Sequence, residues 1–307
     1  MKAVVFAYHN LGMVGLEALA QGKFDIEAIF SHLDDPDENV WFGSVVEWGK
    51  KNQISIFCPK NVNTPKWVEM IRNLSPEVIF SFYYRNLLSG DILRIPSAGS
   101  YNLHGSLLPA YRGRCPVNWV LVKGEQRTGV TLHHMLEGPD SGDIVGQREV
   151  AIKFEDTAYT LYQKLCVKAK ELLEEVLPLI KKGIAPRMPQ DLKQGSYFGG
   201  RRPEDGKINW SWPVMQIYNL VRAVTEPYPG AFTHLPKGKK LFIWWALPEK
   251  DNLSKRPLGA LEFEGDKVYV RASDGRLRLL DIELDKERIM GQKILEFFKK
   301  QGSVILT

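Results

Sequence analysis

Short apolar runs alternate with amphipathic runs from residue 2 to residue 82 of the chain. The apolar runs have the length and β-branched content of strands, and the longer runs between them have helical periodicity. We expect strands at 2–7, 24–30, 54–57 and 78–82, and helices at 11–20, 45–51 and 65–74. Alternation of this kind requires parallel strands joined by right-handed crossovers. The sequence therefore predicts an α/β fold, a Rossmann-like, mostly parallel sheet flanked by helices.

Composition narrows the class of protein. With 307 residues, of which 44% are hydrophobic, the chain can build one large or two medium domains. No apolar run reaches the roughly 18 to 20 residues that a membrane span needs, and residues 1–6 have the pattern of a strand and not of a signal peptide. We therefore expect no membrane insertion and a cytoplasmic location.

Charge and cysteine content exclude further classes. The formal charge of +5 is compatible with phosphorylated small substrates and does not argue for nucleic acid. The three cysteines are widely spaced and form no Cys-x-x-Cys motif, so we expect neither a disulfide framework nor a metal site. Gly12 and Gly15 allow a tight backbone turn after the first strand. They do not complete a dinucleotide-binding fingerprint, so no nicotinamide cofactor is expected.

The stretch from Ser100 to Arg114 carries the main candidate chemistry. A short alternating strand with Asn102 and His104 runs into a loop rich in Gly, Pro and Arg, followed by a predicted helix at 116–122. The two side chains are two residues apart, so they share a face at the strand's carboxyl end, where open α/β sheets bind ligands. An imidazole base beside an amide donor suits acyl transfer to an amine. The alternative is a structural histidine beside a turn-forming asparagine.

A third candidate, Asp140, lies between two predicted strands at 128–135 and 143–152. A carboxylate beside His104 would orient the imidazole ring. The alternative is a local Asx-turn, which the surrounding Gly-Pro-Asp-Ser-Gly sequence allows.

The string Asn-Leu-His-Gly-Ser-Leu-Leu-Pro-Ala-Tyr-Arg-Gly at 102–113 resembles the signature of the folate-dependent formyltransferases. This family includes glycinamide ribonucleotide formyltransferase, methionyl-tRNA formyltransferase and the sugar N-formyltransferases. The resemblance implies that Asn102, His104 and Asp140 are catalytic and that N10-formyltetrahydrofolate is the cosubstrate. The folate contacts that it implies are Asn86, Leu87, Leu88, Arg114, Leu136, Glu137, Gly138, Pro139 and Asp140. For Arg114, a surface salt bridge is the alternative.

Within the family, residues 4–9, 78–85, 118–122 and 129–133 look most like one formyltransferase domain. That domain belongs to the bifunctional enzyme that N-formylates UDP-4-amino-4-deoxy-L-arabinose in lipid A modification. The resemblance implies an acceptor amine on a nucleotide-linked amino sugar. The dehydrogenase half of that enzyme does not follow Thr307, so we expect either a free-standing enzyme or an isolated domain. The nucleotide base, the stereochemistry of the sugar and the oligomeric state, a homo-oligomer included, stay open.

Residues that would contact the sugar nucleotide are weaker candidates. We expect Tyr8 and His9 at the end of the first strand, and Arg201 or Arg202 near a phosphate. The alternative for the two arginines is a solvated linker, because residues 182–206 are rich in Gly, Pro and basic residues.

Several further functions stay open. Methionyl-tRNA formyltransferase shares the signature, but the loop at 33–41 is acidic where those enzymes have a basic, tRNA-gripping segment, so nucleic acid binding is not favoured. The same residues also fit a formyltransferase acting on a dTDP-linked amino sugar, a formyl-folate hydrolase and a non-catalytic binding module.

The second half of the chain has a different pattern of predicted helices and strands. A long helix is predicted at 157–181 and a short one at 210–222, followed by short alternating runs at 240–246, 259–263, 268–272 and 277–282 and a terminal helix at 289–300. Such runs indicate a small β-barrel, and the resemblance implies an OB-like domain. We therefore predict a catalytic domain at 1–187, a linker at 188–206 and an OB-like domain at 207–307.

Overall fold

A computed structural model describes residues 1–34, 39–250, 256–301 and 304–307 of the chain. The chain forms two compact units. The first comprises Met1–Pro116, Arg127–Ala151 and Tyr162–Gly199, and the second comprises Val117–Gln126, Ile152–Leu161 and Gly200–Thr307.

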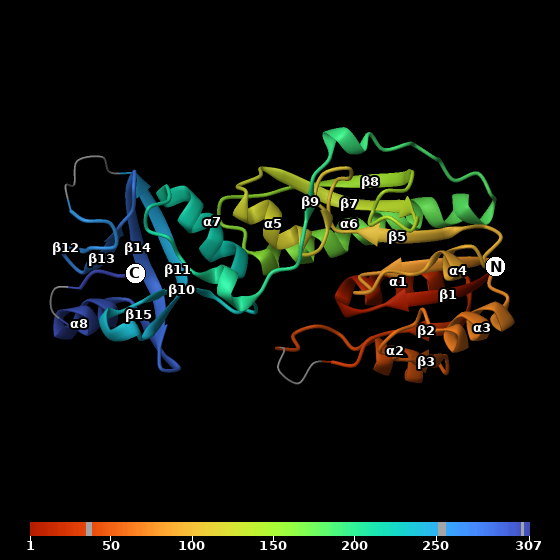
Figure 1. Ribbon diagram of the computed structural model, residues 1–307, viewed down its shortest axis with the longest axis horizontal. Coiled ribbons are helices and arrows are strands. Elements are labelled where there is room, and N and C mark those ends of the chain that lie inside the picture. The colour runs from red at the N-terminus through yellow and green to blue at the C-terminus, as the bar shows by residue number, and fades with distance from the viewer. Residues whose placement is uncertain (35–38, 251–255, 302–303) are drawn as a thin grey trace. The chain divides into compact units, whose positions relative to one another are not determined.

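The first unit is built on a seven-stranded sheet with the order β3-β2-β1-β4-β5-β7-β8 (Figure 1). Its strands are β1 (Lys2–Ala7), β2 (Asp25–Phe30), β3 (Ser55–Phe57), β4 (Val78–Phe82), β5 (Ser100–His104), β7 (Arg127–His134) and β8 (Ile144–Ala151). The first five are parallel, and β7 and β8 form an antiparallel hairpin beside β5. The predicted α/β fold with a mostly parallel sheet is confirmed.

The helices follow the predicted alternation. They are α1 (His9–Gln21), α2 (Val45–Lys51), α3 (Pro65–Leu74), α4 (Gly90–Leu93), α5 (Pro116–Val122) and α6 (Ala158–Lys181). The strand order reverses between β1 and β4, because β2 and β3 lie on one side of β1 while β4 and β5 lie on the other. Ligands of open α/β sheets bind outside the carboxyl ends of the strands at such a point.

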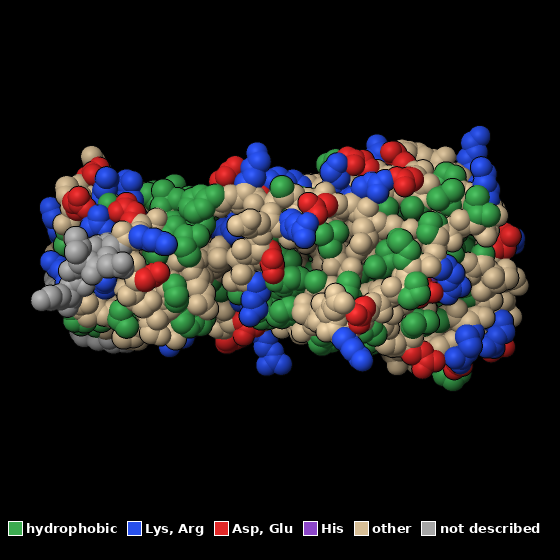
Figure 2. Space-filling model, turned by 90° about the horizontal axis from the view of Figure 1, so that it is seen from above, with side chains coloured by type: hydrophobic (Ala, Val, Ile, Leu, Met, Phe, Trp, Pro, Cys, Tyr) green, Lys and Arg blue, Asp and Glu red, His purple; other side chains and the backbone are tan. Residues whose placement is uncertain are grey.

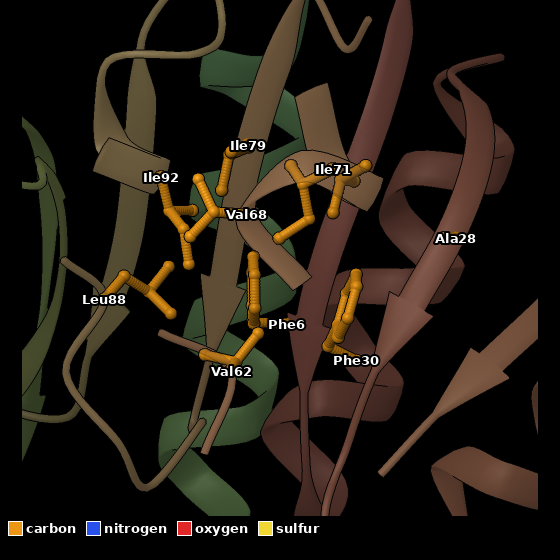
Figure 3. Packing of buried hydrophobic residues seen from close by; sticks show 10 residues of the cluster. Phe6, Ala28, Phe30, Val62, Val68, Ile71, Ile79, Leu88 and Ile92 are labelled. Carbon is orange, nitrogen blue, oxygen red and sulfur yellow. The ribbon is translucent and has the colours of Figure 1, made fainter. Parts of the chain in front are cut away.

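A hydrophobic cluster fixes α3 and α4 against one face of the sheet (Figure 3). Phe6 on β1 and Phe30 on β2 stack with ring centroids 5.0 Å apart. Val68 and Ile71 on α3 are buried in the same cluster, and so is Leu88 from the loop after β4. Leu88 is 7% exposed, so its side chain belongs to the core.

The two glycines after β1 serve packing and not a turn. Both lie within α1, and neither has the positive φ that a tight glycine turn would show. A Cβ atom on Gly15 would collide with the ring of Phe82 on β4, and one on Gly12 would lie 3.2 Å from the backbone of Ala7. The predicted reason for these glycines is therefore wrong. They let α1 lie directly on the sheet.

The second unit contains an antiparallel sheet of six strands, which confirms the predicted β-rich C-terminal region. Five strands follow the order β10-β11-β14-β13-β12, and β15 pairs with β14. Their bounds are β10 (Ala231–His234), β11 (Lys240–Lys250), β12 (Leu261–Glu264), β13 (Lys267–Arg271), β14 (Gly275–Leu284) and β15 (Glu287–Met290). Helices α7 (Val214–Val224) and α8 (Gln292–Gln301) accompany the sheet. Among the described residues, no helix is both long and apolar enough to cross a membrane.

Residues 188–199, part of the predicted linker, are closely bonded within the first unit. Met188 pairs with Ile144, and a 3₁₀ helix spans Leu192–Gln194. Strand β9 (Tyr197–Phe198) then pairs in parallel with β6 (Arg112–Gly113) in the loop after β5. This segment therefore reaches the loop that carries the candidate motif.

Replacing Gly15 with Ala tests the packing of α1. We expect Gly15→Ala to lower the free energy of unfolding by about 1–3 kcal/mol, because the added methyl group must displace the buried Phe82 ring. Urea denaturation followed by circular dichroism measures the change. Gly199→Ala is the control, since a Cβ atom there meets nothing within 4 Å. Equal stability of the two variants would contradict this account.

Candidate active site

Three polar side chains predicted from the sequence meet at the carboxyl end of β5. Asn102 Nδ2 lies 3.2 Å from Asp140 Oδ1, and His104 Nδ1 lies 3.5 Å from the same oxygen. Asp140 reaches them from the loop between β7 and β8, where its backbone has a φ of 49°. The structure thus brings Asn102, His104 and Asp140 together, and the Asx-turn alternative does not describe the contacts of the Asp140 carboxylate.

The Asp140 carboxylate is an anion held inside the protein. Its side chain is 12% exposed. Burial alone would raise the pKa of Asp140, but interactions with its neighbours, His104 foremost and the Gly113 N–H among them, outweigh burial and hold that pKa well below its usual range. The Gly113 N–H donates to Oδ2 at 2.8 Å. Gly113 has a φ of 97°, and a Cβ atom there would collide with the Phe198 carbonyl, so glycine is required at this donor.

The His104 ring is oriented by a backbone carbonyl. Its Nε2 lies 2.8 Å from the Tyr111 carbonyl oxygen, which can only accept a hydrogen bond. Nε2 therefore carries the proton in the neutral ring, and the basic lone pair is on Nδ1. A proton taken up at Nδ1 would face the Asp140 carboxylate. Sequence reasoning gave the orienting role to Asp140, whereas the hydrogen bond within normal length comes from Tyr111.

The loop after β5 is tied down so that this carbonyl can point at His104. Tyr111 adopts a φ of 59°, and Ser106 Oγ donates to the Ala110 carbonyl at 2.6 Å. Thr131 on β7 donates to the Ser106 carbonyl at 2.6 Å and accepts the Leu108 N–H at 3.1 Å. The loop therefore has few ways to move relative to the strands.

Residues 188–199 add a further set of contacts that the sequence did not predict. Gln190 Nε2 donates to the carbonyl oxygens of Asp140 (3.0 Å) and Gly142 (2.6 Å). The Tyr111 N–H donates to Ser196 Oγ at 2.8 Å, and the Tyr111 ring stacks on Phe198 with centroids 5.0 Å apart. No local pattern reveals these contacts, because they join residues far apart in the chain.

A second histidine, His133, also lies at this site and was not among the residues predicted from the sequence. It lies on β7 directly opposite Asn102 on β5. Its Nε2 is 3.1 Å from Asn102 Nδ2 and 3.4 Å from Asp140 Oδ1. The only available signal was its position in a predicted strand, since the register of an antiparallel pair cannot be read from one strand alone.

Most of the predicted folate residues lie on two loops, the one after β4 and the one between β7 and β8. Arg94, directly after α4, contacts Glu137 on the second loop at 3.1 Å. Asn63 fixes the loop after β4, because its Nδ2 donates to the Leu87 carbonyl at 2.9 Å and its Oδ1 accepts the Ser89 N–H at 2.8 Å. Leu87 and Leu136 are 61% and 56% exposed.

The remaining folate candidates lie around these two loops. Asn86 and Gly138 are exposed, and Pro139 is half-buried. Arg114 donates its backbone N–H to the Phe198 carbonyl at 2.9 Å, and its side chain is exposed. Among the described residues, no carboxylate forms an ion pair with Arg114. For all of these residues, contact with folate stays a prediction.

Of the predicted sugar-nucleotide residues, Tyr8 and His9 lie at the carboxyl end of β1. Tyr8 donates its hydroxyl to Asp34 at 3.0 Å, and the Arg85 guanidinium lies 4.6 Å from the centre of its ring. His9 is 5% exposed, and its Nδ1 accepts the Tyr162 hydroxyl at 2.6 Å. That edge of the His9 ring is thus occupied by Tyr162, and the predicted contacts with substrate stay untested.

The two predicted arginines belong to the second unit. Arg201 lies over the Trp119 ring, 4.6 Å from its centre, and donates to the Asp205 carbonyl at 2.9 Å. Arg202 is exposed, and its backbone N–H donates to the Asp205 carboxylate at 2.7 Å. A phosphate contact by either arginine stays a prediction. In the described part of the chain, no three His, Cys, Asp or Glu side chains are grouped to hold a metal.

Burial of His9 predicts acid sensitivity. Burial, and secondly the Arg85 charge, lower the pKa of His9 to about 3 from an ordinary value of 6.5. Below pH 6.5 the unfolded chain takes up a proton that the folded protein refuses, so stability is complete above that pH and falls as the pH drops toward 3. We expect the stability difference between pH 8 and pH 5 to shrink by on the order of 2 kcal/mol in His9→Asn. Urea midpoints at both pH values measure it, and an unchanged difference would contradict the prediction.

Comparison with known proteins gives the family. Residues 1–177 match the model described as formyl transferase, and residues 201–301 match the model of the formyl transferase C-terminal domain. Among solved structures, the fold is similar to that of the N-formyltransferase from Helicobacter canadensis in complex with folinic acid and dTDP-3-aminofucose. The TM-score is 0.71 and the identity 21%, over 91% of this chain and 98% of that one.

Two further structures share the fold. The sugar 3N-formyltransferase WlaRD, determined with dTDP and 5-N-formyl-THF, gives a TM-score of 0.68 at 19% identity, over 91% of this chain and 97% of that one. HypX from Aquifex aeolicus, in complex with tetrahydrofolic acid, gives 0.63 at 18% identity, over 98% of this chain and 48% of that one. Since the first family model spans more than half of the chain and encloses Asn102, His104 and Asp140, the chain belongs to the formyl transferase family.

Proposed function

We propose that the protein transfers the formyl group of N10-formyltetrahydrofolate to the amine of a nucleotide-linked amino sugar. The observation that carries the proposal is the position of one carboxylate oxygen, Asp140 Oδ1, within 3.5 Å of both Asn102 Nδ2 and His104 Nδ1. An amide donor and an imidazole base held at one anion are the groups that formyl transfer to an amine requires.

The chemistry follows from these atoms. The amine nitrogen attacks the formyl carbon and forms the new C–N bond, and negative charge develops on the formyl oxygen. His104 Nδ1 takes the proton released by the amine, and the Asp140 carboxylate stabilises the resulting imidazolium. Asn102 donates to the oxyanion. The bond between the formyl carbon and N10 then breaks, and the proton on His104 passes to N10, which regenerates the neutral ring.

The folate site is proposed at the loop after β4 and the loop between β7 and β8. Leu87 and Leu136 expose apolar surface there, one on each loop, as a flat aromatic ring system would need. Asn63 holds the backbone of the first loop for hydrogen bonding. The folinic acid, 5-N-formyl-THF and tetrahydrofolic acid present in the three similar structures support a folate as the cosubstrate.

The acceptor is proposed to bind outside the carboxyl ends of β1 and β4, where the strand order reverses and Tyr8 lies. The sequence resemblance makes UDP-4-amino-4-deoxy-L-arabinose, of lipid A modification, the first candidate acceptor. A dTDP-linked amino sugar is the second, because the similar structures contain dTDP or dTDP-3-aminofucose.

A tRNA acceptor has less support. On the face shown in Figure 2, Lys and Arg side chains are interspersed with Asp and Glu and do not form one basic surface. Residues 35–38 of the acidic loop at 33–41 lie outside the described residues. In the described part of this loop, Asp34 accepts the Tyr8 hydroxyl. Binding of tRNA depends on Lys and Arg that neutralise phosphates, and the loop at 33–41 contains neither residue type.

The decisive experiment is a formyl-transfer assay with N10-formyltetrahydrofolate and three acceptors in parallel: UDP-4-amino-4-deoxy-L-arabinose, dTDP-3-aminofucose and charged initiator tRNA. We expect turnover on a sugar nucleotide. We also expect kcat to fall ~100-fold or more in His104→Gln, because the glutamine amide is polar but cannot act as a base. Formate release without an acceptor would indicate a hydrolase.

The control for that assay is His234→Gln, a histidine substitution on β10 in the second unit, which we expect to leave kcat unchanged. Near-normal turnover of folded His104→Gln, or activity on tRNA alone, would overturn the proposal.

Loss of the Gln190 contacts should slow the reaction without preventing folding. Gln190→Ala removes two hydrogen bonds to the backbone that carries Asp140, and we expect about a 10-fold lower kcat with little change in KM. Gln194→Ala is the matched control, because the Gln194 amide donates to the exposed Asp191 side chain and not to the backbone that carries Asp140. A kcat of Gln190→Ala equal to that of Gln194→Ala would show that this anchor has no catalytic effect.

A further inference from the structure

His133 is held in one protonation pattern by its neighbours. Its side chain is 2% exposed, and Nδ1 lies 2.8 Å from the carbonyl oxygen of His134. A carbonyl oxygen only accepts hydrogen bonds, so Nδ1 carries the proton in the neutral ring. The neutral His133 ring therefore presents a lone pair at Nε2, toward Asn102.

The orientation of the Asn102 amide is fixed by Asp140. The Asp140 carboxylate is an anion and only accepts, so the amide atom at 3.2 Å from Oδ1 is the NH₂ nitrogen, Nδ2. The same Nδ2 lies 3.1 Å from His133 Nε2. Two acceptors thus face one amide nitrogen, and a flipped amide would place its carbonyl oxygen against both.

The three atoms form a nearly equilateral triangle, since His133 Nε2 and Asp140 Oδ1 are themselves 3.4 Å apart. The directions from Nδ2 to the two acceptors are therefore separated by about half the angle between the two N–H bonds of a planar amide. The amide therefore cannot direct one N–H straight at each acceptor, and the positions of the two acceptors together restrict the tilt of the amide plane.

We propose that His133 is a positioning residue, which together with Asp140 flanks the amide nitrogen of Asn102 and thereby sets the direction in which that amide meets the oxygen of the reacting formyl group. Asp140 alone would fix which amide atom faces it but not the angle of the amide plane. Without the Nε2 acceptor, the amide can turn one N–H directly onto Asp140 Oδ1, and the other N–H swings with it. An oxyanion donor acts only within a narrow range of distance and direction.

Two polar variants separate this role from a merely structural one. In His133→Asn, the shorter amide can still donate to the His134 carbonyl but does not reach Asn102. In His133→Gln, the longer amide places an acceptor oxygen where Nε2 was. We expect kcat to fall about 10- to 100-fold in His133→Asn with acceptor KM nearly unchanged, and to stay within a few-fold of wild type in His133→Gln. Equal losses in the two variants would overturn the proposal.

A double substitution tests whether His133 acts through Asn102. In an Asn102→Ala background there is no amide to aim, so we expect His133→Asn to cause little further loss. The same fold-loss in both backgrounds would show that His133 acts on something else.

A measurement on the unaltered protein needs neither activity nor stable variants. In ¹⁵N NMR of histidine-labelled protein, we expect His133 as the neutral tautomer protonated on Nδ1. Protonation on Nε2 would overturn the proposal, because Nε2 would then not accept from Asn102. The kinetic arms rest on the proposed function, but the tautomer does not, so absence of formyl transfer by the wild-type protein would count against the function alone.

Discussion

The buried carboxylate of Asp140 is the interaction on which the surrounding structure depends. A charge with little exposure costs several kcal/mol of desolvation unless donors and opposite charges surround it. Here the surrounding groups come from β5, from β7 and from the backbone of the loop after β5. Each of these segments must keep its place for the carboxylate to stay ionised. The site is therefore as much a constraint on the fold as a product of it.

The change from parallel to antiparallel pairing at β5 supplies much of this environment. Strand β7 runs antiparallel to β5, and its last residue, His134, pairs with Tyr101 near the start of β5. Because β7 runs the opposite way, it places a side chain directly across from Asn102, on the same face of the sheet. The hairpin loop that follows then returns Asp140 to the carboxyl end of β5. The register of β7 thus brings His133 to Asn102, and the loop after β7 brings Asp140 to both Asn102 and His104.

Sequence patterns predicted the parts of this arrangement that depend on local periodicity. The strand alternation gave the parallel sheet, and the spacing of two residues placed Asn102 and His104 on one face. The same reasoning misjudged Gly12 and Gly15, because a glycine pattern does not distinguish a turn from a close approach of helix and sheet. His133 and Gln190 were missed for a different reason. Their partners are set by strand register and by a segment without regular periodicity, and neither leaves a local signal.

The pairing of β9 with the loop after β5 has a consequence for how the protein is made. All three catalytic candidates lie within the span matched by the first family model, which ends at residue 177. The contacts on Tyr111 and on the backbone of Asp140 come from Gln190, Ser196 and Phe198, beyond that limit. During synthesis, the segment that carries the three candidate residues therefore leaves the ribosome before the strand that completes their surroundings. A fragment cut at the family boundary would contain all three candidates and still lack the contacts from Gln190, Ser196 and Phe198.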